Sequence, residues 1–467
     1  MSGKTWLLFV FSMILLAFVL FGQLMDRPDQ GVSSREWQAN RDSGGQTSGT
    51  KPESDSKTLK VAVSMSTAEF TALQKINQAY EENHPGADIS LQNIPGNEAY
   101  SSIKSAAQSG VLPDILLIPN GWVNEFAASG FLSYRTEDFF TGRNQANELE
   151  PLVSQMKWNG YIWGIPKDAD PYVLVWNKTV LSQKGLDGPP NTPQEFLSSL
   201  QLLAGPEENA PMVYIDPEDP YALISLVWAL GGDWAGEGSS SPDGKKAAGL
   251  DKLLEAVYTP TIKKADKKQE KAQDKLLGKY IFPKRSDPWA ALNQGSFAMM
   301  IARASDFLNH RSAGIGVSML PAVRKGESVK AGWLDGRSFC VAAQSDAVTE
   351  AFDWIKAVTA EKNQEIFLTE ANILPAAAAV LDTQAGKDKN LQEIRQAVKA
   401  GRVLQADPFS PQKFTQMRES MRGFYEGRTS AEELAKAVDR IWLRTPGNES
   451  GTASGITPGV HGATAPN

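Results

Sequence analysis

The segment LKVAVSMSTAEFTALQKINQAY (residues 59–80) decides the fold class of this chain. Apolar residues at every second position over residues 59–63 predict a β-strand. Ser66 and Glu69 have the S-x-x-E spacing of a capping box, and apolar residues follow at helical spacing as far as Tyr80. A strand that leads directly into a helix is the first half of a β-α-β unit.

The same alternation continues along the chain. Residues 87–94 predict a second strand, residues 98–108 a second helix, and ILLI at 115–118 a buried third strand. This order predicts an open, mostly parallel α/β sheet, in which ligands bind beyond the carboxyl ends of the strands. The loops at 64–67 and 119–122 are therefore the first candidate site, and they contribute Ser66 and Trp122.

Length and composition restrict the class further. The chain has 467 residues, 41% hydrophobic and 22% charged, which is enough for two domains with their own cores. The net charge of -7 argues against nucleic acid as a partner. The single cysteine, Cys340, lies in an apolar strand-like run and forms no internal disulfide. The three histidines share no ligand spacing, so we expect no metal and no cofactor.

The N-terminus predicts membrane attachment. Residues 6–25 contain only Ser12 and Gln23 as polar residues, and about 20 apolar residues span a bilayer. Lys4 precedes this run, as expected for a cytoplasmic N-terminus with the remainder outside. No small-residue cleavage pattern and no cysteine follow the run, so we favour an uncleaved anchor at 1–25 over a cleaved signal peptide.

Polar segments delimit the folded body. Residues 26–57 have hardly an aliphatic side chain and predict a flexible linker with a reach of roughly 30 Å. Residues 446–467 form a Gly/Thr/Ala/Pro tail that we expect to be disordered. The lysines of residues 263–279 alternate with acidic residues, which is typical of a solvated helix face.

Short segments along the whole folded body carry a family resemblance. They are SGVLPDI (109–115), YIWGIP (161–166), VLVWNK (173–178), PPNTPQEF (189–196), NQGSFAMM (293–300), AFDWIK (351–356) and ILPA (373–376). In this order they resemble the carbohydrate-type extracellular solute-binding proteins of bacterial ABC importers, the family of maltose-binding protein. The resemblance implies a two-lobed, periplasmic-binding-protein-like α/β fold, in which each lobe is a mostly parallel sheet flanked by helices.

The resemblance also implies a hinge of several chain crossings, with the ligand in the cleft between the lobes. The expected crossings lie near residues 167–171, 320–323 and 375–381. The expected domains are lobe 1 at 58–168 and 322–378, and lobe 2 at 170–320 and 382–445.

A sugar site needs carboxylates that accept from hydroxyls and aromatic faces that cover the ring. Asp170 stands where the family resemblance implies a sugar-binding glutamate. Asp219 and Tyr221, in Asp-Pro-Tyr, resemble a Glu-Pro-Tyr whose acid and ring both contact ligand, and Gly231-Gly232 follow at similar spacing. Both aspartates adjoin a proline, so a turn role is the alternative for each, and Tyr221 has helix packing as its alternative.

The aromatic platform departs from the family pattern. The stacking tryptophan of the family falls near Ser305 here. Trp122, Trp333 and Trp289 are the substitutes by position, and for each the alternative is packing within a lobe. For Trp289 that alternative is the simpler interpretation.

The expected function is capture of a small ligand, a sugar or oligosaccharide, for delivery to an ABC importer by a monomeric protein at the outer face of the membrane. Ligand bound to both lobes is expected to favour a closed state. Two alternatives stay open: a ligand-sensing subunit of a membrane histidine kinase, and an extracellular glycan-acting enzyme with two carboxylates. We expect no enzyme, because the sequence contains no nucleophile motif, metal cluster or cofactor loop.

Overall fold

The computed structural model describes residues 58–134, 136, 150–203, 213–230, 286–322, 324–325, 328–329, 331–426 and 428–443. The predicted anchor, linker and C-terminal tail lie outside these residues, as do Gly231-Gly232 and the lysine-rich segment 263–279. Within the described part of the chain, no helix is both long and apolar enough to cross a bilayer.

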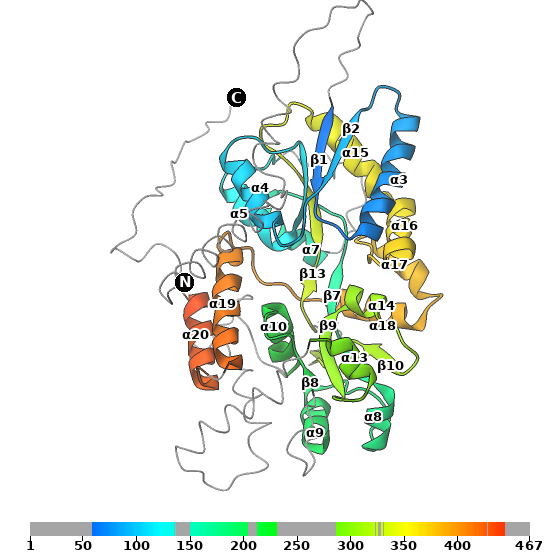
Figure 1. The fold of residues 1–467 in the computed structure, drawn as a ribbon, viewed down its shortest axis with the longest axis vertical. Helices are drawn as coiled ribbons and strands as arrows, with labels where there is room; N and C mark the ends of the chain where they lie inside the picture. Colours follow the sequence, from blue (N-terminus) through cyan, green and yellow to red (C-terminus); the bar gives the residue numbers. More distant parts are fainter. Residues whose placement is uncertain are drawn as a thin grey trace, which may run out of the picture.

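Lobe 1 is built on a five-stranded sheet in the order β2-β1-β3-β14-β6. Strands β1 and β2 of this sheet are labelled in the upper part of Figure 1. Its strands are β1 (Leu59–Val63), β2 (Ile89–Asn93), β3 (Ile115–Pro119), β6 (Ile165–Pro166) and β14 (Arg337–Val341). Strands β1, β2 and β3 are parallel, whereas β14 runs antiparallel to both β3 and β6. The β-α-β-α-β order predicted from residues 59–118 is therefore confirmed.

The helices of lobe 1 cover both faces of this sheet. They are α3 (Thr67–Asn83), α4 (Ala99–Gln108), α5 (Asn120–Ala128), α7 (Glu150–Gln155), α15 (Val348–Val358) and α16 (Glu361–Ala371), and a small hairpin joins β4 (Lys157–Trp158) to β5 (Tyr161–Ile162). Val61 and Val63 pack on one face with the fully buried Trp354, while Ala62 packs on the other face. Both faces are thus apolar, which is why β3 is an unbroken aliphatic run.

Lobe 2 contains a second sheet in the order β10-β7-β9-β8, with β13 also paired to β7. Its strands are β7 (Asp170–Asn177), β8 (Val213–Tyr214), β9 (Met299–Arg303), β10 (Ile315–Ser318) and β13 (Leu334–Asp335), and β11 (Arg324–Lys325) pairs with β12 (Ser328–Val329). The expected two-lobed α/β class is confirmed, but this sheet is not mostly parallel. Among the described strands of this sheet, only β8 and β9 pair in parallel, because β7 runs antiparallel to β9, β10 and β13.

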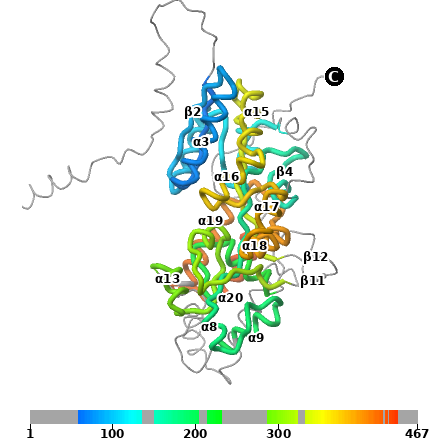
Figure 2. Tube along the Cα trace, turned by 90° about the vertical axis from the view of Figure 1, so that its right-hand side faces the viewer, coloured from blue at the N-terminus to red at the C-terminus, as the bar shows by residue number. Residues whose placement is uncertain are grey.

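The helices around this second sheet come from two distant parts of the chain (Figure 2). They are α8 (Lys178–Gln183), α9 (Pro193–Leu203), α10 (Pro220–Ala229), α13 (Pro288–Asn293), α14 (Ala304–Asn309), α17 (Ala378–Ala385), α18 (Lys389–Lys399), α19 (Ser410–Tyr425) and α20 (Ala431–Leu443). Helix α19 packs on α20 and α10 in lobe 2 and also contacts α5 in lobe 1. It therefore connects the two lobes on one side.

In the part of the chain that the structure describes, the backbone passes between the lobes at three places. The first is the step from β6 to β7, between Pro166 and Asp170, within the predicted 167–171 region. The third lies between α16 and α17, where Pro375 bridges to Asp168.

The sequence predicted the second crossing near 320–323, and this prediction is wrong. Leu320, Ala322 and Trp333 are buried in the core of lobe 2, and the chain leaves that lobe at Gly336, between β13 and β14. A Cβ at Gly336 would lie 2.5 Å from the Asp168 main-chain oxygen. The crossing falls where two backbones approach closely, and only glycine permits that approach.

Candidate functional site

A cavity of about 790 Å³ lies between the two lobes at the crossings. Lobe 1 contributes the loop that follows β1, with Ser66 in the wall, and the first turn of α5, with Trp122 in the wall. Lobe 2 contributes Asp170, Tyr221 and Arg303. The two strand-to-helix junctions predicted from the sequence therefore face the same space, but residues 120–122 belong to α5 and not to a loop as predicted.

Asp170 begins β7 and is held by one residue of lobe 2. Its Oδ1 accepts from the Ser305 main-chain N–H at 2.9 Å, and its Oδ2 accepts from the Ser305 hydroxyl at 2.5 Å. Burial raises the pKa of Asp170 to about 7, although the nearby Arg303 opposes the rise. Each carboxylate oxygen retains a second lone pair, so a ligand hydroxyl can still donate to it.

Tyr221 lies in the first turn of α10 and reaches toward lobe 1. Its ring packs between Phe414, with centroids 4.4 Å apart, and Trp333, with centroids 4.9 Å apart. A Cβ built on Gly121 of α5 would lie 3.6 Å from the Tyr221 hydroxyl oxygen. Tyr221 thus brings an aromatic ring from lobe 2 next to the first turn of α5, which carries Trp122.

Asp219 is not in the cavity wall, but it holds side chains and a helix end that are. Its Oδ1 caps α10 by accepting from the N–H groups of Tyr221 and Ala222, at 3.0 and 3.3 Å. Its Oδ2 accepts from the Tyr172 hydroxyl at 2.6 Å, and that hydroxyl accepts from Arg303 Nε at 3.1 Å. Asp219 thus has a local structural role at the start of α10, and ligand contact by Asp219 stays a prediction.

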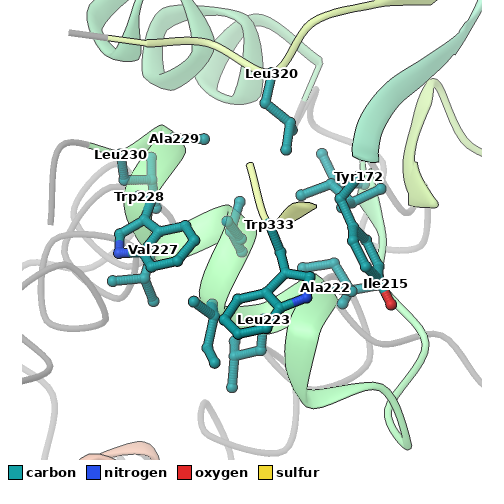
Figure 3. Close-up of a cluster of buried hydrophobic side chains, with 14 of the residues drawn as sticks. Tyr172, Ile215, Ala222, Leu223, Val227, Trp228, Ala229, Leu230, Leu320 and Trp333 are labelled. Atoms are coloured by element: carbon teal, nitrogen blue, oxygen red, sulfur yellow. The ribbon is translucent and has the colours of Figure 1, made fainter. Parts of the chain in front are cut away.

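Of the three candidate tryptophans, Trp122 alone is in the wall of this cavity. Its ring packs edge-on against Tyr100, with centroids 5.0 Å apart. Trp333 is only 4% exposed and stacks on Trp228 in the core of lobe 2 (Figure 3). Trp289 stacks on His310 at 4.5 Å, which agrees with the packing alternative.

Four charged residues that sequence reasoning did not select form a hinge ion cluster: Glu69, Lys167, Asp168 and Arg337. Glu69 Oε1 contacts Lys167 Nζ at 2.6 Å and Arg337 Nη2 at 2.7 Å. Asp168 Oδ2 contacts Arg337 Nη2 at 2.6 Å and Lys167 Nζ at 3.3 Å. The Lys167 and Glu69 side chains are only 1% and 2% exposed.

The hinge ion cluster joins lobe 1 to the crossing strands. Glu69 is on α3, Lys167 and Asp168 follow β6, and Arg337 begins β14. Burial alone would raise the pKa of Asp168, but Arg337 and Lys167 hold it below its ordinary value. The charges of two cations therefore balance those of two carboxylates at a site that is nearly inaccessible to solvent.

The sequence contained one misleading signal for this cluster. Ser66 accepts from the Glu69 N–H at 3.2 Å, as a capping box requires. The Glu69 carboxylate, however, binds Lys167 and Arg337. By contrast, Ser430 and Glu433 form both bonds of their capping box, at 3.2 and 2.7 Å.

Residues 75–414 match the family model described as bacterial extracellular solute-binding protein. A putative binding protein of Brucella abortus is 22% identical over 207 residues, 41% of this chain and 49% of that protein. The chain thus spans about half the length of the first such relatives. A maltotriose-binding protein of Pyrococcus abyssi is 23% identical over 189 residues, 39% of this chain and 37% of that protein.

Among solved structures, the sugar-binding protein MalE of Xanthomonas citri superposes with a TM-score of 0.65. The match covers 83% of this chain and 98% of that one at 17% identity. At that identity the likeness shows a shared fold.

Proposed function

Because the chain belongs to the family of bacterial extracellular solute-binding proteins, we propose that it captures a sugar between its lobes and delivers it to an ABC importer. The observation that carries the proposal is the composition of the cavity wall. A carboxylate acceptor, Asp170, and two rings, Trp122 and Tyr221, come from opposite lobes to one space. Hydroxyl groups and a weakly apolar ring face are the features of a sugar that such a wall complements.

The magnitudes fit a receptor of micromolar affinity. A hydrogen bond to a charged acceptor contributes roughly 1.5–3 kcal/mol. Two such bonds with stacking on Trp122 or Tyr221 approach the roughly 8 kcal/mol of a micromolar complex. We assign ligand contact to Asp170, Tyr221, Trp122 and Ser66.

Asp219 and Trp333 act indirectly in this proposal. Asp219 fixes the start of α10 and, through Tyr172, the Arg303 side chain. Trp333 packs under the Tyr221 ring. Replacing either one is expected to weaken binding by moving Tyr221 or Arg303.

Closure of the lobes is the proposed mechanism. Contacts to Trp122 in lobe 1 and to Asp170 in lobe 2 favour the conformation in which both can bind the same ligand. The three crossings form the hinge, and residues 1–25 hold the monomeric protein at the outer face of the membrane. A compact closed state is what the importer recognises in this scheme.

Binding is tested on the full chain in detergent, by thermal shift against mono- and oligosaccharides with polyols and peptides as controls. A bound sugar at a hundred times its Kd adds about 2.7 kcal/mol to stability. Asp170→Ala is expected to abolish the response, and Asp353→Asn, an exposed position on α15, is expected to leave it unchanged. No response to any sugar would refute the proposed ligand class.

A further inference from the structure

The arginines of the cavity indicate which class of sugar it takes, an inference that rests on the proposed function. Three guanidinium groups line the wall: Arg303, Arg337 and Arg418. They differ in how many hydrogen bonds and ion pairs they form with the protein. The N–H groups that have no acceptor among the described residues are available to a ligand.

Arg337 uses most of its N–H groups for hydrogen bonds at the hinge. Its Nε and Nη2 donate to Asp168 at 3.0 and 2.6 Å, its Nη2 also donates to Glu69 at 2.7 Å, and its Nη1 donates to the Ser64 carbonyl at 3.1 Å. Its charge is balanced within the hinge ion cluster. Four of its five N–H groups are therefore used.

Arg418, on α19, has no carboxylate partner among the described residues. Its Nε donates to the Glu218 main-chain carbonyl at 2.9 Å. The Glu218 carboxylate instead pairs with Arg422 at 3.0 Å. Both terminal amino groups of Arg418 lack a hydrogen-bond acceptor within the described part of the chain.

Arg303 uses only some of its N–H groups for contacts within the protein. Its Nε donates to the Tyr172 hydroxyl at 3.1 Å, and its Nη2 lies 3.3 Å from Asp335 Oδ2. The side chain is 40% exposed, and Nη1 has no acceptor among the residues that the structure describes. Burial raises the pKa of Tyr221, and both Arg303 and Arg418 act against that rise, which places the two cations near the same hydroxyl.

The carboxylates in the cavity wall do not accept hydrogen bonds from the unused N–H groups of Arg418 and Arg303. Glu69 and Asp168 belong to the hinge ion cluster, and Glu370 pairs with Lys75 at 2.6 Å. Asp335 shares Arg303, and Asp170 takes both of its hydrogen bonds from Ser305. Because burial raises the pKa of Asp170 to about 7, its charge is only partial near neutral pH. The wall beside Tyr221 thus carries N–H donors, on Arg418 and on Nη1 of Arg303, that the described residues leave unused, although Asp335 and Asp219 lie near the same hydroxyl.

We propose that the ligand is an anionic sugar, whose carboxylate or phosphate pairs with Arg418 and with Nη1 of Arg303 while its hydroxyls donate to Asp170. A guanidinium group with two free amino groups matches a carboxylate or phosphate by two parallel hydrogen bonds. The ring of the sugar then lies against Tyr221 and Trp122. A neutral sugar would leave the Arg418 charge without a partner inside the closed cavity.

Matched pairs of ligands test the proposal by calorimetry at pH 7.5 on the full chain in detergent. The pairs are galacturonate with galactose, glucuronate with glucose, and glucose 6-phosphate with glucose. We expect at least one anionic member to bind tenfold or more tightly than its neutral parent, and the pair that responds separates carboxylate from phosphate. Raising the salt concentration is expected to reduce this preference, because screening weakens partly exposed charges.

Arg418→Gln is expected to remove the anionic preference and to leave the neutral parent unaffected. Arg422→Gln is the matched control, since it lies one turn along α19 and pairs with Glu218 at the surface. Arg418→Lys, which keeps the charge but not the two parallel bonds, is expected to retain part of the preference, and unchanged melting temperatures exclude misfolding.

Equal or tighter binding of every neutral parent would overturn the anionic-sugar proposal and leave the sugar-receptor function standing. An anionic preference that survives Arg418→Gln would overturn it as well. Absence of binding by all five sugars would also overturn the anionic-sugar proposal, and the wider screen of mono- and oligosaccharides would then decide the proposed function.

Discussion

Removing one charge from the hinge ion cluster is expected to destabilise the protein strongly. Glu69→Gln leaves Lys167 and Arg337 with only Asp168, so one positive charge stays buried without a carboxylate. The Glu69 side chain is 2% exposed, and the two cations approach its Oε1 to 2.6 and 2.7 Å. Breaking a buried pair from one side costs about 3–5 kcal/mol, because the partner remains desolvated and unpaired.

The double variant Glu69→Met/Lys167→Met restores the balance of charge. It leaves Arg337 paired with Asp168 through contacts of 2.6 and 3.0 Å, and it fills the space with apolar side chains of similar length. Replacing a buried ion pair by apolar residues is often neutral, so we expect the double variant to be within about 1–2 kcal/mol of the parent protein.

Urea unfolding of the parent, of the single variants Glu69→Met and Lys167→Met, and of the double variant measures the coupling between the two positions. The free energies of unfolding should be strongly non-additive, with each single variant less stable than the double. If Glu69→Gln cost less than about 1 kcal/mol, or if the single effects simply added, the cluster would not be a coupled buried network. Exposed Glu432→Gln, whose pair with Lys436 is at the surface, is the matched control and should change stability by less than about 0.5 kcal/mol.

Further changes test other parts of the structure. Asp170→Asn should become increasingly stabilising relative to the parent as the pH rises from about 4 to 7, and should then level off. Between the ordinary pKa of 3.8 and the folded pKa of about 7, Asp170 ionises more readily in the unfolded parent, so a rising pH lowers the stability of the parent. At pH 8 we expect Asp170→Asn to raise the free energy of unfolding by about 1–2 kcal/mol, a value that allows for the partial exposure of the side chain. A difference in urea midpoint that does not change with pH would contradict the raised pKa. Gly336→Ala should cost about 1–3 kcal/mol in urea unfolding, because the new Cβ would meet the Asp168 oxygen at 2.5 Å; an unchanged midpoint would show that the crossing relaxes freely. Trp354→Ala should cost about 3–5 kcal/mol, since the ring is fully buried and its Nε1 donates to Asn77 at 2.9 Å, and calorimetry showing a smaller loss would place this ring outside the core of lobe 1.

The parts of the fold that local patterns encode were predictable. The alternation of Leu59, Val61 and Val63 followed by the Ser66 cap specified a strand and a helix without reference to the rest of the chain. The crossing at Gly336 was not predictable in this way. It depends on the approach of Asp168, which is distant in sequence, and a glycine between two short strands has no local pattern that distinguishes it from a turn.

The site was predictable where the rule of parallel sheets applied. Ser66 and Trp122 follow β1 and β3, and both line the cavity. Trp333 was a candidate by position, but Trp228 and Phe414 enclose it, and that enclosure arises only when α10 and α19 pack together. Glu69 satisfied a helix-start pattern, which hid its pairing with two cations from another part of the chain.

The antiparallel strand β14 also constrains the order in which the protein acquires its structure. It lies between β3 and β6, and Ser338 on β14 bonds Asn120 from a position 218 residues away in sequence. The sheet of lobe 1 is therefore incomplete until most of the chain has been synthesised, and such long-range pairing folds slowly. We therefore expect this delay to keep the N-terminal half unfolded, and competent for translocation, while the rest of the polypeptide is still being made. A circular permutant that places β14 directly after β3 should fold faster and be secreted less efficiently.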